Sequence, residues 1–242
     1  MQDALRPSAR AFKAVRRFIR TKPLGTFGAF LVILFIFTAI FADQIAPFPY
    51  DVGNGSDRLQ GPSSQFIFGT DNIGRDMFSR IVFGSRISVA VGFGAVLVGT
   101  GLATVMGILS GYVGGRFDLL FQRFVDIWIA FPALVLLIAI VTIFTTRNTD
   151  SVSSIAIVAV TLGVLVAAGS SRVVRSAVIA IRHQPYMEAA RAVGVTDWRI
   201  IMRYVLPNVF APILILATVQ LGGAILAEST LSFLGFGVKP PM

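Results

Sequence analysis

The chain has 242 residues, of which 55% are apolar and only 14% are charged, whereas soluble domains carry about 25% charged residues, so the composition predicts a membrane protein. The net charge is +9, and in a membrane protein an excess of Lys and Arg reports orientation rather than nucleic-acid binding. The absence of cysteine and the single histidine exclude disulfide bonds, thiolate chemistry and a His-rich metal site.

Charge-free windows of membrane-spanning length recur along the chain. A bilayer core about 30 Å thick needs about 20 helical residues. In the last window, Pro207 and Pro212 predict a helix that begins near Asn208 and kinks at Pro212. We therefore predict an all-α polytopic membrane protein with five spans. The five windows are 23–42, 87–115, 127–146, 151–171 and 204–227.

Basic residues concentrate in segments that five spans place on one side of the membrane. The tail 1–22 carries seven of the 21 Lys and Arg residues, and the segments after the second and fourth spans carry two and six. Cytoplasmic loops are enriched in Lys and Arg, so the N-terminus is predicted to be cytoplasmic. The long apolar core after the tail fits a retained span, 23–46, rather than a cleaved signal peptide.

The segment 47–86 is predicted to be an external loop. Its first part is rich in Pro, Gly, Ser and Asp, which indicates irregular chain. Asp71 and Arg75 lie four residues apart, as do Asp76 and Arg80. A short helix there would neutralise both pairs locally.

A charged segment, EAARAVGVTDWRIIMRYVLPN, begins at Glu188 between the fourth and fifth spans, on the predicted cytoplasmic side. Pro185 suits the first turn of a helix, in which Glu188 favours the N-terminal dipole. Gly194 is placed to end this helix, and Asp197 or the preceding threonine can cap a second helix that Pro207 would stop. The segment predicts two short helices joined by a glycine turn.

The first of these helices offers a small apolar surface. Two interpretations stay open from the pattern alone: a helix or basic loop that binds lipid headgroups at the membrane surface, or a docking element for a protein partner. The surface is formed by Tyr186, Met187, Ala189, Ala190 and Val193.

Few ionisable residues lie near the spans. Asp126, at the inner edge of the third span, is predicted to pair with Arg123, three residues away. Glu228, at the outer end of the fifth span, either lines a path or contacts an external protein, or it caps a short STLSFLG helix. His183 is interpreted as an interfacial side chain rather than a proton relay. Trp128 and Trp198 fit membrane-interface anchors, and Gly107 and Gly111 fit close helix packing.

The charged segment resembles the EAA signature of membrane subunits of bacterial ABC importers. The match comprises Glu188, Ala189, Ala190, Gly194 and the closing Leu206 and Pro207. The resemblance implies a coupling helix that sits in a cleft of a separate ATPase subunit, within a cytoplasmic loop at 172–207. The implied coupling residues are Tyr186, Met187, Glu188, Ala189, Ala190, Arg191, Val193, Gly194 and Asp197, with Leu206 and Pro207 ending the loop.

A second stretch, FGTDNIGRDMFSRIVFGSRISV, resembles a block of the C-type permease in dipeptide, oligopeptide, nickel and glutathione importers. LAESTLSFLGFGVKPP is similar to the segment before the last span of that family. The resemblance implies a type I ABC importer transmembrane core over 87–242, with the family's sixth span not present in this sequence. The matching residues are Gly69, Thr70, Asp71, Gly74, Arg75, Asp76, Ser79, Arg80, Gly84, Arg86 and Ser88.

The resemblance implies a non-catalytic permease subunit in the bacterial inner membrane that forms half of a path for di- or oligopeptides. Its implied partners are a second permease in a heterodimer, two ATPase subunits, which would bind ATP and Mg²⁺, and an extracytoplasmic substrate-binding protein. The chain has no GxxxxGK[ST] phosphate loop, so no cofactor, metal or catalytic residue is assigned to it. The alternatives are nickel or glutathione as substrate, or a stand-alone secondary transporter or channel, which would need ionisable residues at mid-span.

Overall fold

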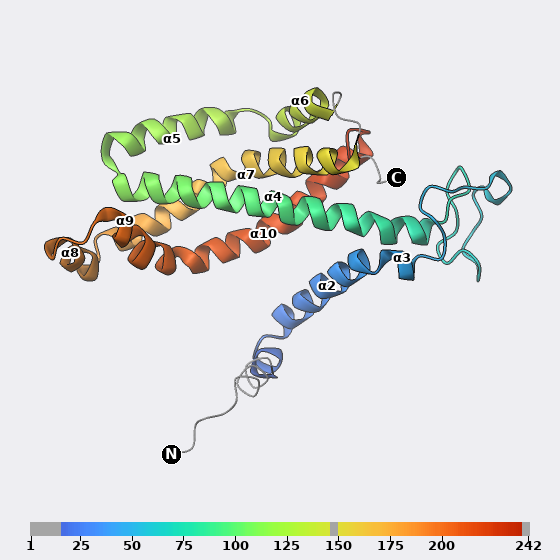
Figure 1. Ribbon diagram of the computed structural model, residues 1–242, viewed down its shortest axis with the longest axis horizontal. Coiled ribbons are helices and arrows are strands. Elements are labelled where there is room, and N and C mark those ends of the chain that lie inside the picture. Colours follow the sequence, from blue (N-terminus) through green and yellow to red (C-terminus); the bar gives the residue numbers. More distant parts are fainter. Residues whose placement is uncertain (1–15, 146–149, 239–242) are drawn as a thin grey trace, which may run out of the picture. The chain divides into compact units, whose positions relative to one another are not determined.

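The computed structural model describes residues 16–145 and 150–238, and every regular element in those ranges is a helix (Figure 1). This confirms the predicted all-α class. The elements are α2 (Pro23–Ile40), α3 (Ala42–Ile45), the 3-10 turn η1 (Gly55–Asp57), α4 (Met77–Val113), α5 (Gly115–Ala130), α6 (Ala133–Thr145), α7 (Ser151–Arg182), α8 (Pro185–Ala192), α9 (Asp197–Ile200), the π turn η2 (Ile201–Val205) and α10 (Leu206–Phe233).

Four helices in the described ranges are long and apolar enough to cross a membrane: α2, α4, α7 and the continuous helix Asp197–Phe233. A fifth crossing arises if α5 and α6, which are bent by 82° at the break between them, count as one span. The window predicted as the third span, 127–146, therefore begins in α5 and continues into α6, with a break between the two helices. Phe131 is extended (φ −81°, ψ 137°), because the ring of Pro132 disfavours a helical conformation in the residue before it.

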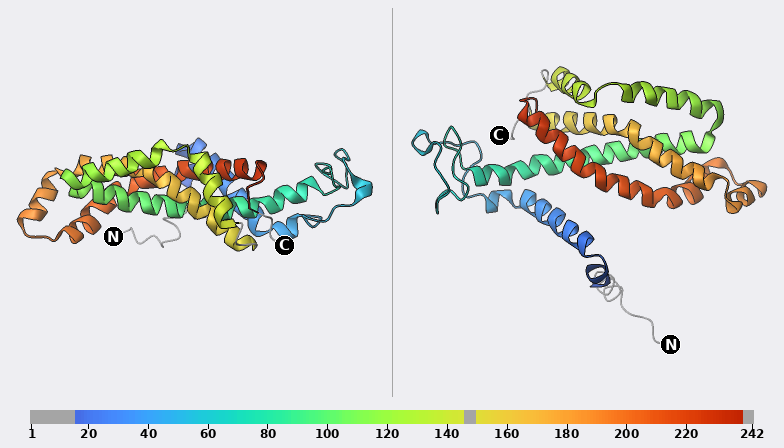
Figure 2. Two further views of the ribbon diagram at one scale, coloured as in Figure 1. Left: turned by 90° about the horizontal axis from the view of Figure 1, so that it is seen from above. Right: turned by 180° about the vertical axis from the view of Figure 1, so that it is seen from behind.

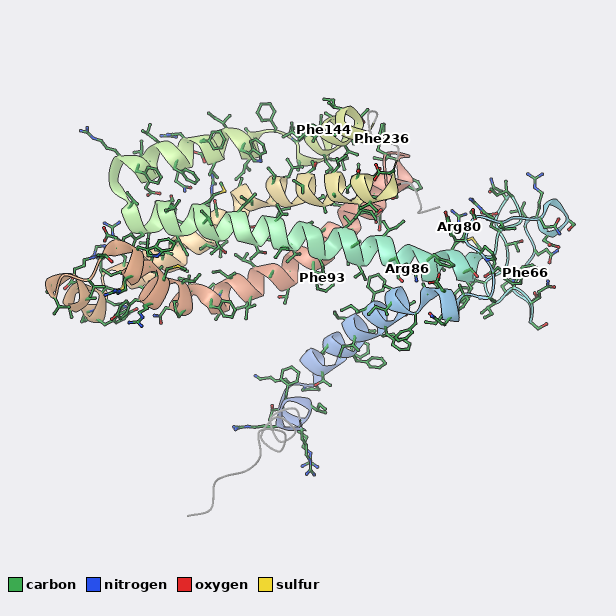
Figure 3. The ribbon with its side chains drawn as sticks, viewed as in Figure 1. Phe66, Arg80, Arg86, Phe93, Phe144 and Phe236 are labelled. Atoms are coloured by element: carbon green, nitrogen blue, oxygen red, sulfur yellow. The ribbon has the colours of Figure 1, made fainter. Side chains whose placement is uncertain are left out.

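The chain divides into two compact units, Met1–Arg86 and Ile87–Met242. In the first unit, an irregular segment between α3 and α4 carries Phe66, and the first turns of α4 carry Arg80 and Arg86 (Figure 3). This segment is organised around Asp71. Its Oδ1 accepts hydrogen bonds from the backbone N–H groups of Ile73 and Arg75, both at 2.9 Å.

The Asp71 side chain also pairs with two guanidinium groups of the first unit. Oδ2 lies 2.8 Å from Nε of Arg75 and 2.5 Å from Nη1 of Arg80. Burial alone would raise the pKa of Asp71, but the N–H groups of Arg75 and Ile73 and the Arg75 guanidinium outweigh it and hold this pKa well below its ordinary value. The pairing of Asp71 with Arg75 was predicted, although through a different conformation.

A helix across residues 71–80 does not form, since α4 begins only at Met77. Gly74 has φ +81°, and a Cβ there would lie 1.9 Å from the carbonyl oxygen of Asn54, so a tight glycine turn replaces the predicted helix. Asp76 does not pair with Arg80. Its Oδ2 accepts a hydrogen bond of 2.8 Å from the Ser79 N–H and thereby caps the start of α4.

In the second unit, α7 contacts α5, α6 and α10 and is the central helix. Two further views show α4, α7 and α10 running alongside one another (Figure 2). The window predicted at 87–115 lies in α4 up to Val113, where this helix ends, and that at 151–171 lies in the longer α7.

Two apolar clusters hold the second unit together. The loop cluster joins α4, α7, α8, α9, η2 and α10 and consists of Ile108, Tyr112, Val174, Val178, Met187, Ala190, Ile200, Val205, Val209 and Ile213. The distal cluster joins α4, α6, α7 and α10 and consists of Val91, Ala95, Leu137, Val141, Val158, Leu162, Ala224, Leu231 and Val238. Because α4, α7 and α10 contribute to both clusters, these three helices connect the short loop helices with the distal end of the unit.

Candidate functional site: the charged loop between α7 and α10

The first loop helix, α8, forms where the sequence predicts it. Pro185 occupies its first position, where the missing N–H costs no helical hydrogen bond. After its last residue the chain reverses at Gly194, which has φ +77°. The N–H of Gly194 donates to the Arg191 carbonyl (3.0 Å) and the N–H of Val195 to the Ala190 carbonyl (3.1 Å), which is a Schellman motif.

Gly194 is required by its backbone conformation rather than by crowding. No heavy atom lies within 4 Å of the position that a Cβ would take. A side chain would therefore meet open space, but an L-residue would be strained at this positive φ.

The second loop helix does not end where it was predicted to end. α9 continues through the π turn η2 into α10, and the N–H of Leu206 donates to the Ile201 carbonyl, five residues earlier. The prediction that Pro207 stops this helix is wrong. Proline lacks an N–H and its ring crowds the carbonyl four residues before it, and the wider π turn accommodates both effects. Leu206 and Pro207 are thus the first two residues of α10.

The apolar surface predicted on α8 divides between two faces. Met187 is fully buried, and Ala190 is buried beside it in the loop cluster. Val193 is 79% exposed, while Glu188 and Ala189 also face outward. Met187 and Ala190 therefore anchor the helix in its own subunit, and only the remaining face is open to a partner.

The exposed face of the loop also includes aromatic side chains. Tyr186 is half-exposed, and its ring stacks on Tyr204 of η2 with the centroids 6.5 Å apart. Trp198 of α9 is 69% exposed. The loop therefore presents large apolar groups beside the charged Glu188 and Arg191.

A side chain that the sequence did not single out attaches the loop to α4. The hydroxyl of Tyr112 donates a hydrogen bond of 2.6 Å to Oδ1 of Asp197. The guanidinium carbon of Arg191 lies 5.6 Å from the centroid of the same Tyr112 ring, within cation–π range. No local spacing relates Tyr112 to residues so much later in the chain, so sequence reasoning had no signal for this contact.

Ion pairs also join α5 to α7, the helix that precedes the loop. Nε of Arg175 lies 2.6 Å from Oδ1 of Asp118, which also accepts a hydrogen bond from Ser110 of α4. Asp126 lies 3.8 Å from Arg123, as predicted, but it also forms a closer pair with Arg172 of α7. The predicted local salt bridge is therefore part of a contact between helices.

Close packing of α4 against α7 occurs at two glycines, as the sequence predicts. A Cβ at Gly107 would lie 2.7 Å from the carbonyl oxygen of Ser171, and one at Gly111 would lie 2.9 Å from that of Arg175. Small residues at these positions let the two backbones approach one another.

Sequence reasoning also missed a polar cluster among the three long helices. Nε2 of Gln220 (α10) donates to Oγ of Ser170 (α7) at 2.6 Å, and Oγ1 of Thr100 (α4) lies 3.5 Å from the Gln220 Oε1. These uncharged side chains have donors and acceptors for one another, as polar contacts between membrane helices do.

Two residues singled out in the sequence lie elsewhere. Glu228 is buried within α10 and accepts a hydrogen bond of 2.7 Å from Ser232. It does not cap a separate helix, because α10 continues through it to Phe233. His183 is the exposed C-cap residue of α7, next to the loop. Among the described residues, no group of three or more His, Cys, Asp or Glu side chains is arranged to hold a metal ion.

Comparisons with known proteins agree with this architecture. Residues 103–241 match the family "Binding-protein-dependent transport system inner membrane component", and residues 11–62 match the "N-terminal TM domain of oligopeptide transport permease C". The dipeptide transport system permease protein DppC of Alkalihalophilus pseudofirmus is 41% identical over 239 residues, which are 99% of this chain and 75% of that protein.

Two glutathione transport system permease proteins, both called GsiD, are also similar. The protein from Pectobacterium atrosepticum is 37% identical over 228 residues, 94% of this chain and 73% of its own length. That from Escherichia coli O6:K15:H31 is 37% identical over 227 residues, 93% of this chain and 72% of its own length. With its all-helical fold and its membrane-spanning helices, the chain therefore belongs to the C-type transmembrane permeases of peptide ABC importers.

Proposed function

We propose that this chain forms half of a translocation path for di- or oligopeptides and is moved by separate ATPase subunits through α8. The complete importer would contain a second permease, two ATPase subunits and an external substrate-binding protein. The N-terminus and the loop would face the cytoplasm, which the distribution of Lys and Arg supports.

The observation that carries this proposal is the division of α8 into a buried and an exposed face. Met187 and Ala190 fix the helix in the loop cluster, while Glu188, Ala189 and Val193 are accessible to another protein. A partner that grips the exposed face would move the whole helix, because its buried face is packed against α4, α7 and η2. The ion pairs between α5 and α7 would hold these two helices together as a rigid support for the loop.

The mechanism is alternating access between two states of the subunit. A partner shifts such an equilibrium only if it contacts the two states differently. ATP binding would close the two ATPase subunits, and the movement of their surfaces would carry α8 with them. The path would then open toward the external binding protein.

The decisive experiment is purification and reconstitution of the complex with a charge reversal at Glu188. Wild-type protein should bring ATPase subunits with it in detergent. Glu188→Lys should insert normally but lose more than about tenfold in peptide uptake per ATP hydrolysed, because a charge at a protein interface would be reversed. Asp51→Lys makes the same change of charge in the external segment, where Asp51 is exposed, and should keep the wild-type ratio.

Two results would contradict the proposal. If no ATPase chain co-purifies and uptake proceeds alone, the chain acts as a secondary transporter or channel. If Glu188→Lys and Asp51→Lys both retain wild-type coupling, the exposed face of α8 is not the surface that the ATPase subunits grip.

Glutathione is a second candidate substrate, supported by the 37% identity to the two GsiD proteins. Competition separates the candidates. Unlabelled dipeptide should suppress uptake of labelled dipeptide by the reconstituted importer, and unlabelled glutathione in equal excess should not. The reverse pattern would assign glutathione.

A further inference from the structure

We propose that Tyr112 is a positioning residue that makes α4 follow the movement of the coupling loop. This inference rests on the proposed function, since it assumes that ATPase subunits move α8. It assigns to one side chain of α4 the connection between the loop and a helix that is not its neighbour in the chain.

Tyr112 contacts residues on both sides of the glycine turn. Arg191, in the last turn of α8, lies before Gly194, and Asp197, at the start of α9, lies after it. Tyr112 contacts both, through its ring face and its hydroxyl respectively. One side chain thus holds the two loop helices on either side of their turn, so that they move as a single body.

α4 differs from α7 and α10 in the way it is connected to the loop. α7 and α10 are joined to the loop by the chain itself, through His183 and Val205. α4 is not adjacent to the loop in the chain and contacts it through side chains, of which Ile108 and Tyr112 belong to the loop cluster. Among these, Tyr112 makes the directional contact, because a hydrogen bond to a carboxylate fixes geometry as well as distance.

From its contact with the loop at Tyr112, α4 extends to the far end of the second unit. Gly107 and Gly111 lie against α7 within the first turns beyond Tyr112. Farther along, Val91 and Ala95 of the same helix pack in the distal cluster with α6, α7 and α10. A displacement applied at Tyr112 therefore reaches the distal cluster along one continuous helix.

The contact is built from a buried ring and a more exposed acid. Tyr112 is only 9% exposed, whereas Asp197 and Arg191 lie at the surface of the loop. The ring can therefore remain in the cluster when its hydroxyl is removed, which makes Tyr112→Phe a conservative change. It would delete the hydrogen bond and keep the apolar packing and the cation–π contact with Arg191.

The test uses the complete importer in proteoliposomes and measures uptake of a labelled dipeptide per ATP hydrolysed. Tyr112→Phe, Asp197→Ala and the double variant should each lower this ratio about tenfold, because a hydrogen bond to a charged group contributes enough free energy for such a factor. The double variant should be no worse than either single variant, since all three lose the same contact. Asp197→Asn keeps an acceptor oxygen and should recover most of the ratio.

Three results would overturn the inference: a wild-type ratio in Tyr112→Phe, losses that multiply in the double variant, or equal losses of uptake and ATPase activity that leave the ratio unchanged. The last would indicate a merely structural contact. If Tyr112→Phe does not assemble into the importer, uptake per ATP hydrolysed is measured instead with Asp197→Ala, which changes a residue at the surface of the loop and removes the same hydrogen bond. Glu188→Lys tests the proposed function separately: if it uncouples and Tyr112→Phe does not, only the role of Tyr112 fails.

Discussion

The segment between α3 and α4, which we propose to be external (the external segment), and the loop between α7 and α10, which we propose to be the coupling loop, are both charged segments between apolar helices, but they are held in different ways. The external segment is held by contacts within itself: the Asp71 carboxylate accepts hydrogen bonds from two backbone N–H groups and pairs with two guanidinium groups, all from within ten residues of its own position. The coupling loop is held by side chains from distant helices, with Met187 in the loop cluster and Asp197 on Tyr112. The first is therefore held by contacts within its own stretch of sequence, whereas the second is packed into the core of the second unit.

The largest effect is expected where the loop enters the core. Met187→Ala should lower the free energy of unfolding by about 3 kcal/mol, because it leaves a cavity in the loop cluster. Val193→Ala, on the exposed face of the same loop, should change it by less than about 0.5 kcal/mol. Thermal unfolding of the purified complex measures both. Equal effects of the two substitutions would mean that the loop is not anchored by its buried face.

A smaller effect is expected in the external segment, and it should stay local. Asp71→Asn should destabilise this segment by about 2 kcal/mol, because it weakens hydrogen bonds to charged groups. Limited proteolysis of the segment measures the loss, with Asp51→Asn at an exposed position as the control. Uptake per ATP should not change; a loss of coupling would break the distinction between the two regions.

The same carboxylate gives a pH dependence of known sign. The pKa of Asp71 is lowered in the folded state, so its contribution to stability is complete above its ordinary value of about 3.9 and is lost only as the pH falls below it. Protection of the external segment from an acid-active protease should therefore be constant from neutral pH to about 5. It should decrease below about 4 in the wild type, and Asp71→Asn should lack this decrease.

A still smaller effect is expected at the glycine turn of the loop. Gly194→Ala should cost about 1 kcal/mol through its positive φ and lower uptake per ATP a few-fold. Gly194→Asn should be milder, since asparagine tolerates this conformation. Gly101→Ala is the matched control, because Gly101 lies in α4 with open space around its Cα. If asparagine and alanine are equally harmful, size rather than backbone conformation limits this position.

The smallest effect is expected for the exposed ion pair of the first unit. Oδ2 of Asp43 lies 2.7 Å from Nη2 of Arg86, and hydrogen bonding to Arg86 lowers the pKa of the Asp43 carboxyl. Such pairs at the surface contribute little. Asp43→Asn should not measurably shift the thermal midpoint, and a clear shift would show that the external segment depends on α3 more than its internal bonds suggest.

Local signals in the sequence were sufficient for most of the fold. Apolar windows located the long helices, and Pro185 and Gly194 located the ends of α8 correctly. Pro132 indicates the break between α5 and α6, but the prediction relied on the length of the apolar window and missed it. No such signal indicated that α9 continues through Pro207. The π turn that allows this depends on the packing of α10 as well as on the proline.

The candidate site was predictable only in part, for a physical reason. An eight-residue helix is too short for periodicity to separate Met187 and Ala190, which face the core, from Ala189 and Val193, which do not. The direction of each side chain is decided by packing against α7 and against α4, of which α4 is remote in sequence. The bond between Tyr112 and Asp197 is of the same kind and joins residues 85 positions apart.

The break at Pro132 has a consequence for the way lipid surrounds this subunit. α6 has 13 residues, so at about 1.5 Å each it is shorter than the hydrocarbon layer and does not cross it alone. Backbone groups left without helical partners at such a bend are tolerated only where protein or water covers them. A hollow lined by Trp128, Phe131 and Ser170 lies at this bend, so this is where we expect a neighbouring helix or ordered water, rather than lipid, to cover the peptide groups of the kink.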